Sequence, residues 1–257
     1  MLRRLIAAAG TDQLLQVEVS ATDAAITVLK DGKPVTWAWR DLQLQQVDSD
    51  VLNVDQDSFT IDQFQLDDLG HLFSVAALIA DSAEGQELQI VDSSSGEVMM
   101  SVSTLPESRT VFFYPDGRLL PKLDYDSESG VASGLKDAIG ARDQALAIGL
   151  KSDVGAYLDY AGTGEKVTVR RLRPASVPIT IIERSERTDN AAFSPTLVSS
   201  AAIWRVVKRA RDAGTLAAGQ PWSVVVEARD GAPLPSMYFR FGISQLATDL
   251  AGHALKS

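Results

Sequence analysis

The chain has 257 residues, of which 45% are hydrophobic and 23% are charged. This balance is typical of a folded protein and excludes a disordered chain, and no apolar run approaches the roughly 20 residues that a membrane-spanning helix needs. The net charge of −10 argues against nucleic-acid binding, and the absence of cysteine excludes disulfides, thiolate nucleophiles and cysteine-ligated metal sites. We therefore expect a cytoplasmic protein that binds neither nucleic acid nor a membrane.

The first predicted element is a short helix over about residues 2–9. A helix is favoured over a signal peptide because the apolar stretch after Arg3 and Arg4 ends at Gly10 without a clear cleavage site. Alternating apolar and polar residues then predict four strands, "LLQVEVS", "AAITVLK", "PVTWAWR" and "LQLQQVD". Between the second and third strands, the tetrapeptide at 31–34, Asp-Gly-Lys-Pro, predicts a hairpin turn.

An amphipathic helix is predicted over about residues 66–80. Leu69, Leu72, Phe73 and Ala76 recur at the i, i+3, i+4, i+7 spacing of one helix face. Three further strands are expected to follow it. Because neighbouring strands are joined by short turns, they should pair in the antiparallel sense.

The second half of the chain repeats this pattern at an offset of 134 residues. Phe59 then aligns with Phe193, and the pair at 85–86, Gly-Gln, aligns with the same pair at 219–220. A short helix is expected over about 131–139, strands at "ALAIGL", "VGAYLDYA", "KVTVRRLR" and "VPITIIER" with a turn at "GTGE", and an amphipathic helix over about 197–213. The repeat predicts a tandem duplication.

The predicted fold class is therefore α+β, with two tandem duplicated units. Each unit should contain an antiparallel sheet covered by a long amphipathic helix, plus a short first helix. The expected units are residues 1–120, with a net charge of −12, and residues 131–257, with a net charge of +4, joined by a polar connector at 121–130.

No pattern in the sequence indicates a catalytic or metal site. The chain has only two histidines, His71 and His253, and lacks the Gly-x-Ser-x-Gly pattern of a nucleophile elbow. In "LDYDSESG", Asp124, Asp126 and Glu128 follow the spacing of the first ligands of a calcium loop. However, the glycine comes one place late and Leu135 stands where the bidentate glutamate belongs. We expect no catalytic residue, no metal and no cofactor.

Basic residues gather on one predicted strand and one predicted helix of the second half. They are Lys166, Arg170, Arg171 and Arg173 on the strand, and Lys208, Arg209 and Arg211 on the helix. The matching helix positions of the first half hold Ser74, Val75 and Ala77. The basic residues are either a solvated or internally paired face, or a patch for an anionic partner formed by Arg170, Arg171, Arg173, Lys208 and Arg211.

Two tryptophans form the second candidate site. Trp37 and Trp39 alternate on "VTWAWR" and so share one face of a strand. Such indole rings usually pack in a core under a helix. If that face is open, the pair is instead an aromatic platform for a ligand.

These patterns favour a non-enzymatic protein that binds another protein, as an adaptor, chaperone or regulator. The alternative is a binder or enzyme for a small anionic ligand in a groove between the two units. A third possibility is a homo-oligomer in which the acidic unit of one copy binds the basic unit of another.

Overall fold

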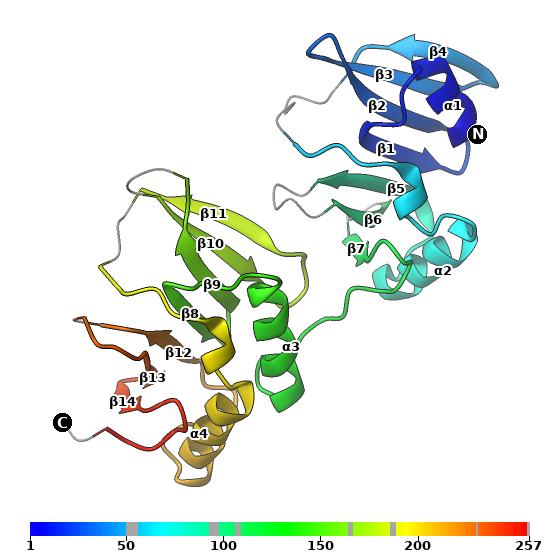
Figure 1. The fold of residues 1–257 in the computed structure, drawn as a ribbon. Coiled ribbons are helices and arrows are strands. Elements are labelled where there is room, and N and C mark those ends of the chain that lie inside the picture. Colours follow the sequence, from blue (N-terminus) through cyan, green and yellow to red (C-terminus); the bar gives the residue numbers. More distant parts are fainter. Residues whose placement is uncertain are drawn as a thin grey trace. The chain divides into compact units, whose positions relative to one another are not determined.

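The computed structural model describes residues 1–49, 56–92, 98–105, 109–163, 167–185, 189–229 and 231–255. The chain divides into two compact units, Met1–Leu120 and Pro121–Ser257. Among the described residues, each unit has one seven-stranded antiparallel sheet and two α-helices (Figure 1), so the protein is α+β with two similar units. No helix in these ranges is long and apolar enough to cross a membrane.

The first unit follows the predicted order of elements. Helix α1 (Leu2–Ala9) precedes strands β1 (Leu14–Ser20), β2 (Ala24–Lys30), β3 (Lys33–Arg40) and β4 (Gln43–Val47). A short 3-10 helix η1 (Ile61–Gln63) leads to α2 (Leu69–Ala80), β5 (Glu84–Asp92), β6 (Val98–Leu105) and β7 (Arg109–Phe113). The four strands predicted between residues 14 and 48 are confirmed, and the order across the sheet is β4-β3-β2-β1-β5-β6-β7.

The second unit repeats this arrangement. Helix α3 (Glu128–Ile139) precedes strands β8 (Ala147–Lys151), β9 (Gly155–Ala161), β10 (Thr168–Arg173) and β11 (Thr180–Arg184). The 3-10 helix η2 (Pro195–Leu197) leads to α4 (Ser200–Asp212), β12 (Trp222–Glu227), β13 (Ser236–Phe241) and β14 (Ser244–Thr248). The strand order is β11-β10-β9-β8-β12-β13-β14, which is the order of the first unit shifted by seven strands. The last two residues of the "GTGE" turn, together with Lys166, lie outside the described residues.

The two units also share isolated β-bridges outside their regular strands. In each unit a residue at or just before the start of the first strand forms an isolated bridge to the phenylalanine before the 3-10 helix, and the last segment of the unit bridges back to a sheet residue. These bridges are Leu14 to Phe59 and Phe113 to Leu119 in the first unit, and Ala145 to Phe193 and Thr248 to Ala254 in the second. Matching bridges fix the correspondence of residues between the units independently of sequence identity.

The predicted hairpin turn between β2 and β3 has the expected backbone. Asp31 and Gly32 both have positive φ, 51° and 74°, as the two central residues of a type I′ turn require. This turn sets the register in which Thr27 pairs with Thr36. Their hydroxyl groups are 2.8 Å apart and buried.

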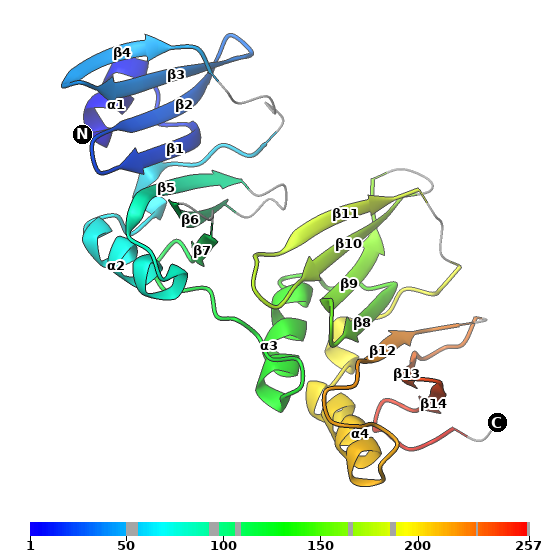
Figure 2. The same ribbon diagram turned by 180° about the vertical axis from the view of Figure 1, so that it is seen from behind.

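The helices of each unit lie over one face of its sheet (Figures 1 and 2). Helix α1 contacts β2 and β3, α2 contacts β6 and β7, and α3 contacts β8, β9 and β10. Helix α2 begins later than the predicted residue 66 because the side chain of Asp68 caps it, accepting the backbone N–H of His71 at 2.9 Å. Leu72 and Ala76 of the predicted apolar stripe are buried, and Leu69 and Phe73 are half-buried.

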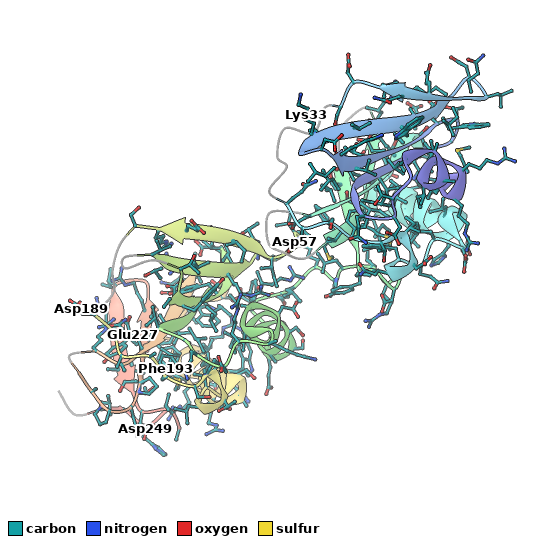
Figure 3. The ribbon with its side chains drawn as sticks, turned by 45° about the horizontal axis from the view of Figure 1, so that its top comes forward. Lys33, Asp57, Asp189, Phe193, Glu227 and Asp249 are labelled. Carbon is teal, nitrogen blue, oxygen red and sulfur yellow. The ribbon has the colours of Figure 1, made fainter. Side chains whose placement is uncertain are left out.

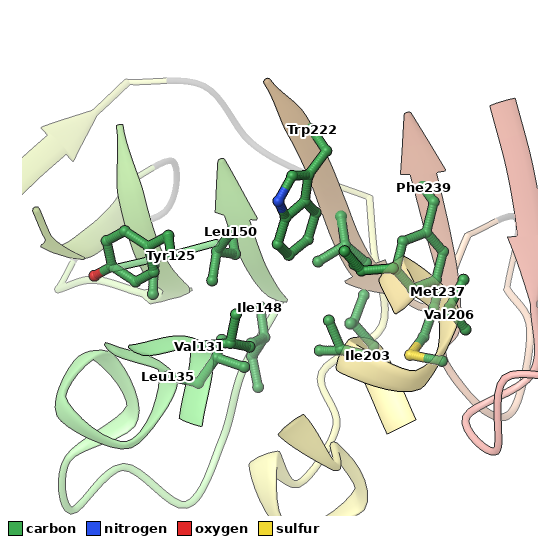
Figure 4. Close-up of a cluster of buried hydrophobic side chains, with 14 of the residues drawn as sticks. Tyr125, Val131, Leu135, Ile148, Leu150, Ile203, Val206, Trp222, Met237 and Phe239 are labelled. Atoms are coloured by element: carbon green, nitrogen blue, oxygen red, sulfur yellow. The ribbon is translucent and has the colours of Figure 1, made fainter. Parts of the chain in front are cut away.

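Each unit has its own core cluster of buried apolar side chains. In the second unit, side chains of α3 and α4 point toward those of β8, β12 and β13 (Figure 4). Leu123 and Tyr125 belong to this core, although they lie in the segment 121–130 that we expected to be a polar connector. The difference arises because Leu123 donates its N–H to the carbonyl of Ala175 and the Tyr125 hydroxyl donates to the carbonyl of Arg173.

Candidate functional site

The arginines of β10 point to opposite faces of the sheet, because side chains alternate along a strand. Arg171 and Arg173 lie on the face that the helices cover, and Arg170 lies on the other face. The predicted patch is therefore divided by the sheet itself. Each side chain must be considered with the groups that surround it.

Arg173 is an internal anchor, with 1% of its surface exposed. Its Nε donates to the Oδ2 of Asp137 at 3.1 Å, and its Nη2 donates to the carbonyl of Pro121 at 3.0 Å. Its Nη1 donates to the carbonyls of Val177, at 2.8 Å, and Pro174. All three guanidinium nitrogens are thus used within the unit, and they join the start of the unit to α3 and to the loop after β10.

Arg171 is also buried, under the end of α3. Its Nε donates to the carbonyl of Ala138 at 3.2 Å. A Cβ atom added to Gly140 would lie 3.2 Å from its Nη2, so glycine leaves space for the guanidinium. Arg171 and Arg173 therefore bind parts of their own unit rather than facing solvent, in agreement with the internally paired alternative and not with an exposed patch for an anionic partner.

The first unit places an indole where the second places the Arg173 guanidinium. Counting across each sheet from the matched residues of β5 and β12 gives two equivalent rows. They are Ile90, Val17, Ile26 and Trp37 in the first unit, and Val224, Leu150, Ala156 and Arg173 in the second. The fold thus accepts either an apolar ring or a fully hydrogen-bonded cation at this position.

Arg170 forms a bidentate ion pair on the face of the sheet that the helices do not cover. Its Nε and Nη2 donate to the two carboxylate oxygens of Asp159, each at 2.7 Å, and its guanidinium lies 3.7 Å from the ring centroid of Tyr157. Burial alone would lower the pKa of Arg170, but the hydrogen bonds and charge of Asp159 raise it. Burial raises the pKa of Tyr157 to about 12. Both groups therefore keep one protonation state around neutral pH.

The two predicted site residues of α4 differ in their environments. Arg211 donates to the carbonyl of Asp126 at 3.1 Å and to its Oδ1 at 2.8 Å, and that oxygen also accepts the indole N–H of Trp222 at 3.0 Å. Lys208 is exposed. Because Asp126 is held in this way and Asp124 accepts the N–H of Asp126 at 2.9 Å, the two carboxylates do not converge as calcium ligands.

The two tryptophans of β3 face α1. Trp37 and Trp39 are half-buried and pack against the first core cluster, as Leu2 and Ile6 of α1 also do. This is the core-packing interpretation of the pair. The alternative interpretation, a ligand platform, required an open face.

The two histidines lie in different units. His71 is exposed on α2. His253 places its Nδ1 3.0 Å from Asp249, which lies at the margin of the second unit (Figure 3), and hydrogen bonds from His253 lower the pKa of Asp249. In the ranges that the structure describes, no group of three or more His, Asp or Glu side chains could hold a metal ion.

The surface that sequence reasoning missed is the outer side of α2. Leu78 is 83% exposed and Ile79 is 46% exposed, and Val75 is half-buried beside them. We call His71, Val75 and Leu78, which lie at successive turns, the α2 face. At the offset of 134 these positions hold Arg205, Arg209 and Asp212 in α4. Val75 and Leu78 are thus apolar where the matching residues of the second unit, Arg209 and Asp212, are charged.

A surface groove runs beside the α2 face. Its volume is about 350 Å³, and its walls include Asp68, Val75, Asp116, Gly117 and Leu119. We call it the α2 groove. It separates α2 from the segment that follows β7, which carries the exposed side chain of Leu119.

In the second unit, arginine side chains cross the corresponding position. Arg205 donates to the carbonyl of Ala251 at 3.4 Å, and Arg209 donates to the carbonyl of Gly252. These arginines match His71 and Val75, which reach no such carbonyl. The signal for this site was already present in the aligned helices, but the alignment drew attention to the basic residues rather than to the apolar ones opposite them.

The open faces of the two sheets hold further charged groups. In the second unit a hollow of about 450 Å³ is lined by Lys151, Arg229 and Arg240, among others, and Arg229 is paired with Glu227 (labelled in Figure 3). In the first unit, burial and the negative charge of Glu18 raise the pKa of Glu87, while Arg40 opposes the shift. In each unit these groups lie on the face of the sheet that the helices do not cover.

No protein-family model matches this chain. No curated protein shows significant sequence similarity to it.

Proposed function

We propose that this protein is a non-enzymatic interaction protein, an adaptor or chaperone, that binds another polypeptide through the α2 face of its first unit. The observation that carries the proposal is the 83% exposure of Leu78, in the last turn of the apolar helix α2, beside Ile79, which is 46% exposed. Burying one leucine or isoleucine side chain is worth about 1.5–3 kcal/mol. Contiguous exposed apolar patches, rather than single exposed side chains, mark protein-binding sites, and Val75, Leu78 and Ile79 are neighbours on the surface of α2.

The second unit supports this interpretation as an internal comparison. Its helix α4 occupies the same place in the same topology and carries Arg205, Arg209 and Asp212 on its outer side. A charged outer side is therefore compatible with this fold. The apolar residues of α2 are not required by the architecture, and binding a partner gives them a physical reason.

We further propose that the two units arose by tandem duplication and then diverged. The identical strand order and the matching bridges support this proposal. In this account α4 retained a polar outer side, whereas α2 became a binding element. The absence of cysteine supports a cytoplasmic location.

The test is site-specific photo-crosslinking in cells that express the full-length chain. A benzoylphenylalanine residue is placed at Leu78 or, as the matched control, at Asp212 in α4. We expect discrete protein adducts at position 78 that are at least about fivefold more abundant than those at 212, and we expect the change Val75→Arg in the same chain to reduce them. Equal labelling at both positions contradicts the proposal.

The same protein can be used to test the alternative, a small-anion binder. The thermal unfolding midpoint is measured in the presence of phosphate, citrate or a nucleotide mixture, because a ligand that binds only the folded state raises this midpoint. We expect no shift beyond that of an equal ionic strength of chloride. A specific shift together with unselective crosslinking would favour the alternative.

A further inference from the structure

The two units differ in how the groove between the second helix and the last segment is filled. In both units this segment makes the same set of backbone hydrogen bonds. They are Tyr114 N to Arg118 O, Gly117 N to Tyr114 O and Leu120 N to Phe112 O in the first unit, and Asp249 N to His253 O, Gly252 N to Asp249 O and Leu255 N to Ala247 O in the second. Asp116 and Gly117 therefore correspond to Ala251 and Gly252.

The space beside the corresponding glycines shows the difference. Gly117 and Gly252 have nearly the same φ, 80° and 86°. A Cβ atom at Gly252 would lie 2.9 Å from Val206 and 3.2 Å from the Nη2 of Arg209, whereas one at Gly117 would meet no atom closer than 3.8 Å. The second unit thus fills this position with its own arginine, and the first unit leaves it open.

We propose that the α2 groove binds a basic, amphipathic helix of the partner polypeptide. A partner arginine or lysine donates to the carbonyls of Asp116 and Gly117, as Arg205 and Arg209 do to Ala251 and Gly252. Apolar partner side chains cover Val75 and Leu78. This inference rests on the proposed function and specifies the chemistry of the partner.

Charge favours a basic occupant over the other possibilities. The carboxylates of Asp68 and Asp116 line the groove together with Arg118, whose guanidinium pairs with Asp116 at 2.6 Å, so two negative charges accompany one positive charge. Hydrogen bonds from the backbone and side chain of Arg118 lower the pKa of Asp116, which therefore stays ionised. The first unit as a whole carries −12, so two copies that met through their α2 faces would repel each other, and an anionic partner would be disfavoured.

The combination of contacts predicts an amphipathic helix rather than a purely basic tail. The α2 face offers apolar area at Val75 and Leu78, and helix-in-groove recognition uses apolar anchors at the i, i+3, i+4, i+7 spacing. The carbonyls and carboxylates lie at one border of that apolar area, on the segment after β7 and at the start of α2. A basic residue beside an apolar stripe matches both features.

The test uses fluorescence anisotropy with the full-length chain and three labelled synthetic helices of about 18 residues. One combines leucine with arginine, one combines leucine with glutamate, and one combines glutamine with arginine at the same positions. We expect the leucine–arginine helix to bind at least about tenfold more tightly than either of the others. Equal binding of the leucine–glutamate helix would overturn the inference.

Two matched variants test the location. Val75→Arg restores the residue type found at the equivalent position of α4 and should fill the α2 groove, so we expect binding of the leucine–arginine helix to fall at least about tenfold. Ser74→Arg adds the same charge at a neighbouring exposed position outside the groove lining, and we expect affinity within about threefold of the unmodified chain. Equal losses in both variants would show a general charge effect and would also overturn the inference.

The result separates this inference from the proposed function. If crosslinking at position 78 is selective but the three helices bind alike, polypeptide binding stands and the basic chemistry is wrong. If crosslinking is unselective as well, both proposals fail. Circular dichroism of each variant checks that the fold is retained.

Discussion

Replacing Arg173 by methionine should strongly destabilise the second unit. Methionine fills similar space but has no donor, so the carboxylate of Asp137 and the carbonyls of Pro121, Pro174 and Val177 lose their partner. Removing one member of a buried ion pair costs about 3–5 kcal/mol, and each buried acceptor left unpaired costs about 1–3 kcal/mol. Asp137 is partly exposed and water can replace one bond, so we expect a total loss of about 3–5 kcal/mol.

The loss is measured by urea unfolding followed by tryptophan fluorescence. Trp37 and Trp39 are changed to phenylalanine in every variant, so that Trp204 and Trp222 report on the second unit alone. With a typical slope of about 1.5–2 kcal/mol per molar urea, the midpoint should fall by about 2 M. A fall below about 0.5 M would refute the reasoning, because it would mean that the buried guanidinium contributes little beyond its volume.

Two further substitutions control this experiment. Arg173→Lys keeps the charge but not the planar fork that reaches several acceptors, so we expect an intermediate loss of about 1–3 kcal/mol. Lys122→Met removes a cation from an exposed position nearby in the chain and should change the free energy of unfolding by less than about 0.5 kcal/mol. Equal effects of Arg173→Met and Lys122→Met would also contradict the assignment.

Three other predictions follow from contacts within each unit. Gly130→Ala should destabilise the second unit by at least about 2 kcal/mol in urea, because its Cβ would lie 1.9 Å from the carbonyl oxygen of Asp124. Glu87→Gln should raise the free energy of unfolding at pH 7 by less than about 1 kcal/mol. Burial and the charge of Glu18 raise the pKa of Glu87, so the gain should vanish below its ordinary pKa of 4.5, where the folded carboxyl is protonated. Tyr157, with its pKa raised by burial to about 12, should ionise well above the ordinary value of 10.0, and its contribution to stability should be full below pH 10 and lost as the pH rises through 12.

Each of these three predictions has a defined control. Gly70→Ala, whose Cβ would meet only the Asp68 side chain at 3.6 Å, should stabilise α2 by about 0.5–1 kcal/mol. For the glutamate, an equal gain from Glu87→Gln at pH 3.5 and pH 7 would show that charge is not the cause. For the tyrosine, the difference in ultraviolet absorbance between the unmodified chain and Tyr157→Phe isolates one phenol, and a midpoint near pH 10 would contradict its burial.

The sequence by itself determined the strands, their hairpins and the repeat, because these depend on local patterns. Alternation of apolar and polar residues predicts a strand wherever it falls, and Asp31-Gly32 specifies its turn through backbone geometry alone. The offset of 134 was visible because matched residues such as Phe59 and Phe193 occupy the same place in both units. Identical strand orders followed from this repeated pattern.

Only the tertiary structure decided which residues are accessible. Alternation places Arg171 and Arg173 on one face of β10, but it does not indicate that α3 covers that face or that carbonyls from residues 121, 174 and 177 converge on Arg173. Likewise, the periodicity of α2 identifies its buried stripe but not that Leu78 remains exposed. Burial depends on which distant segments pack against a side chain, and a one-dimensional pattern does not contain that information.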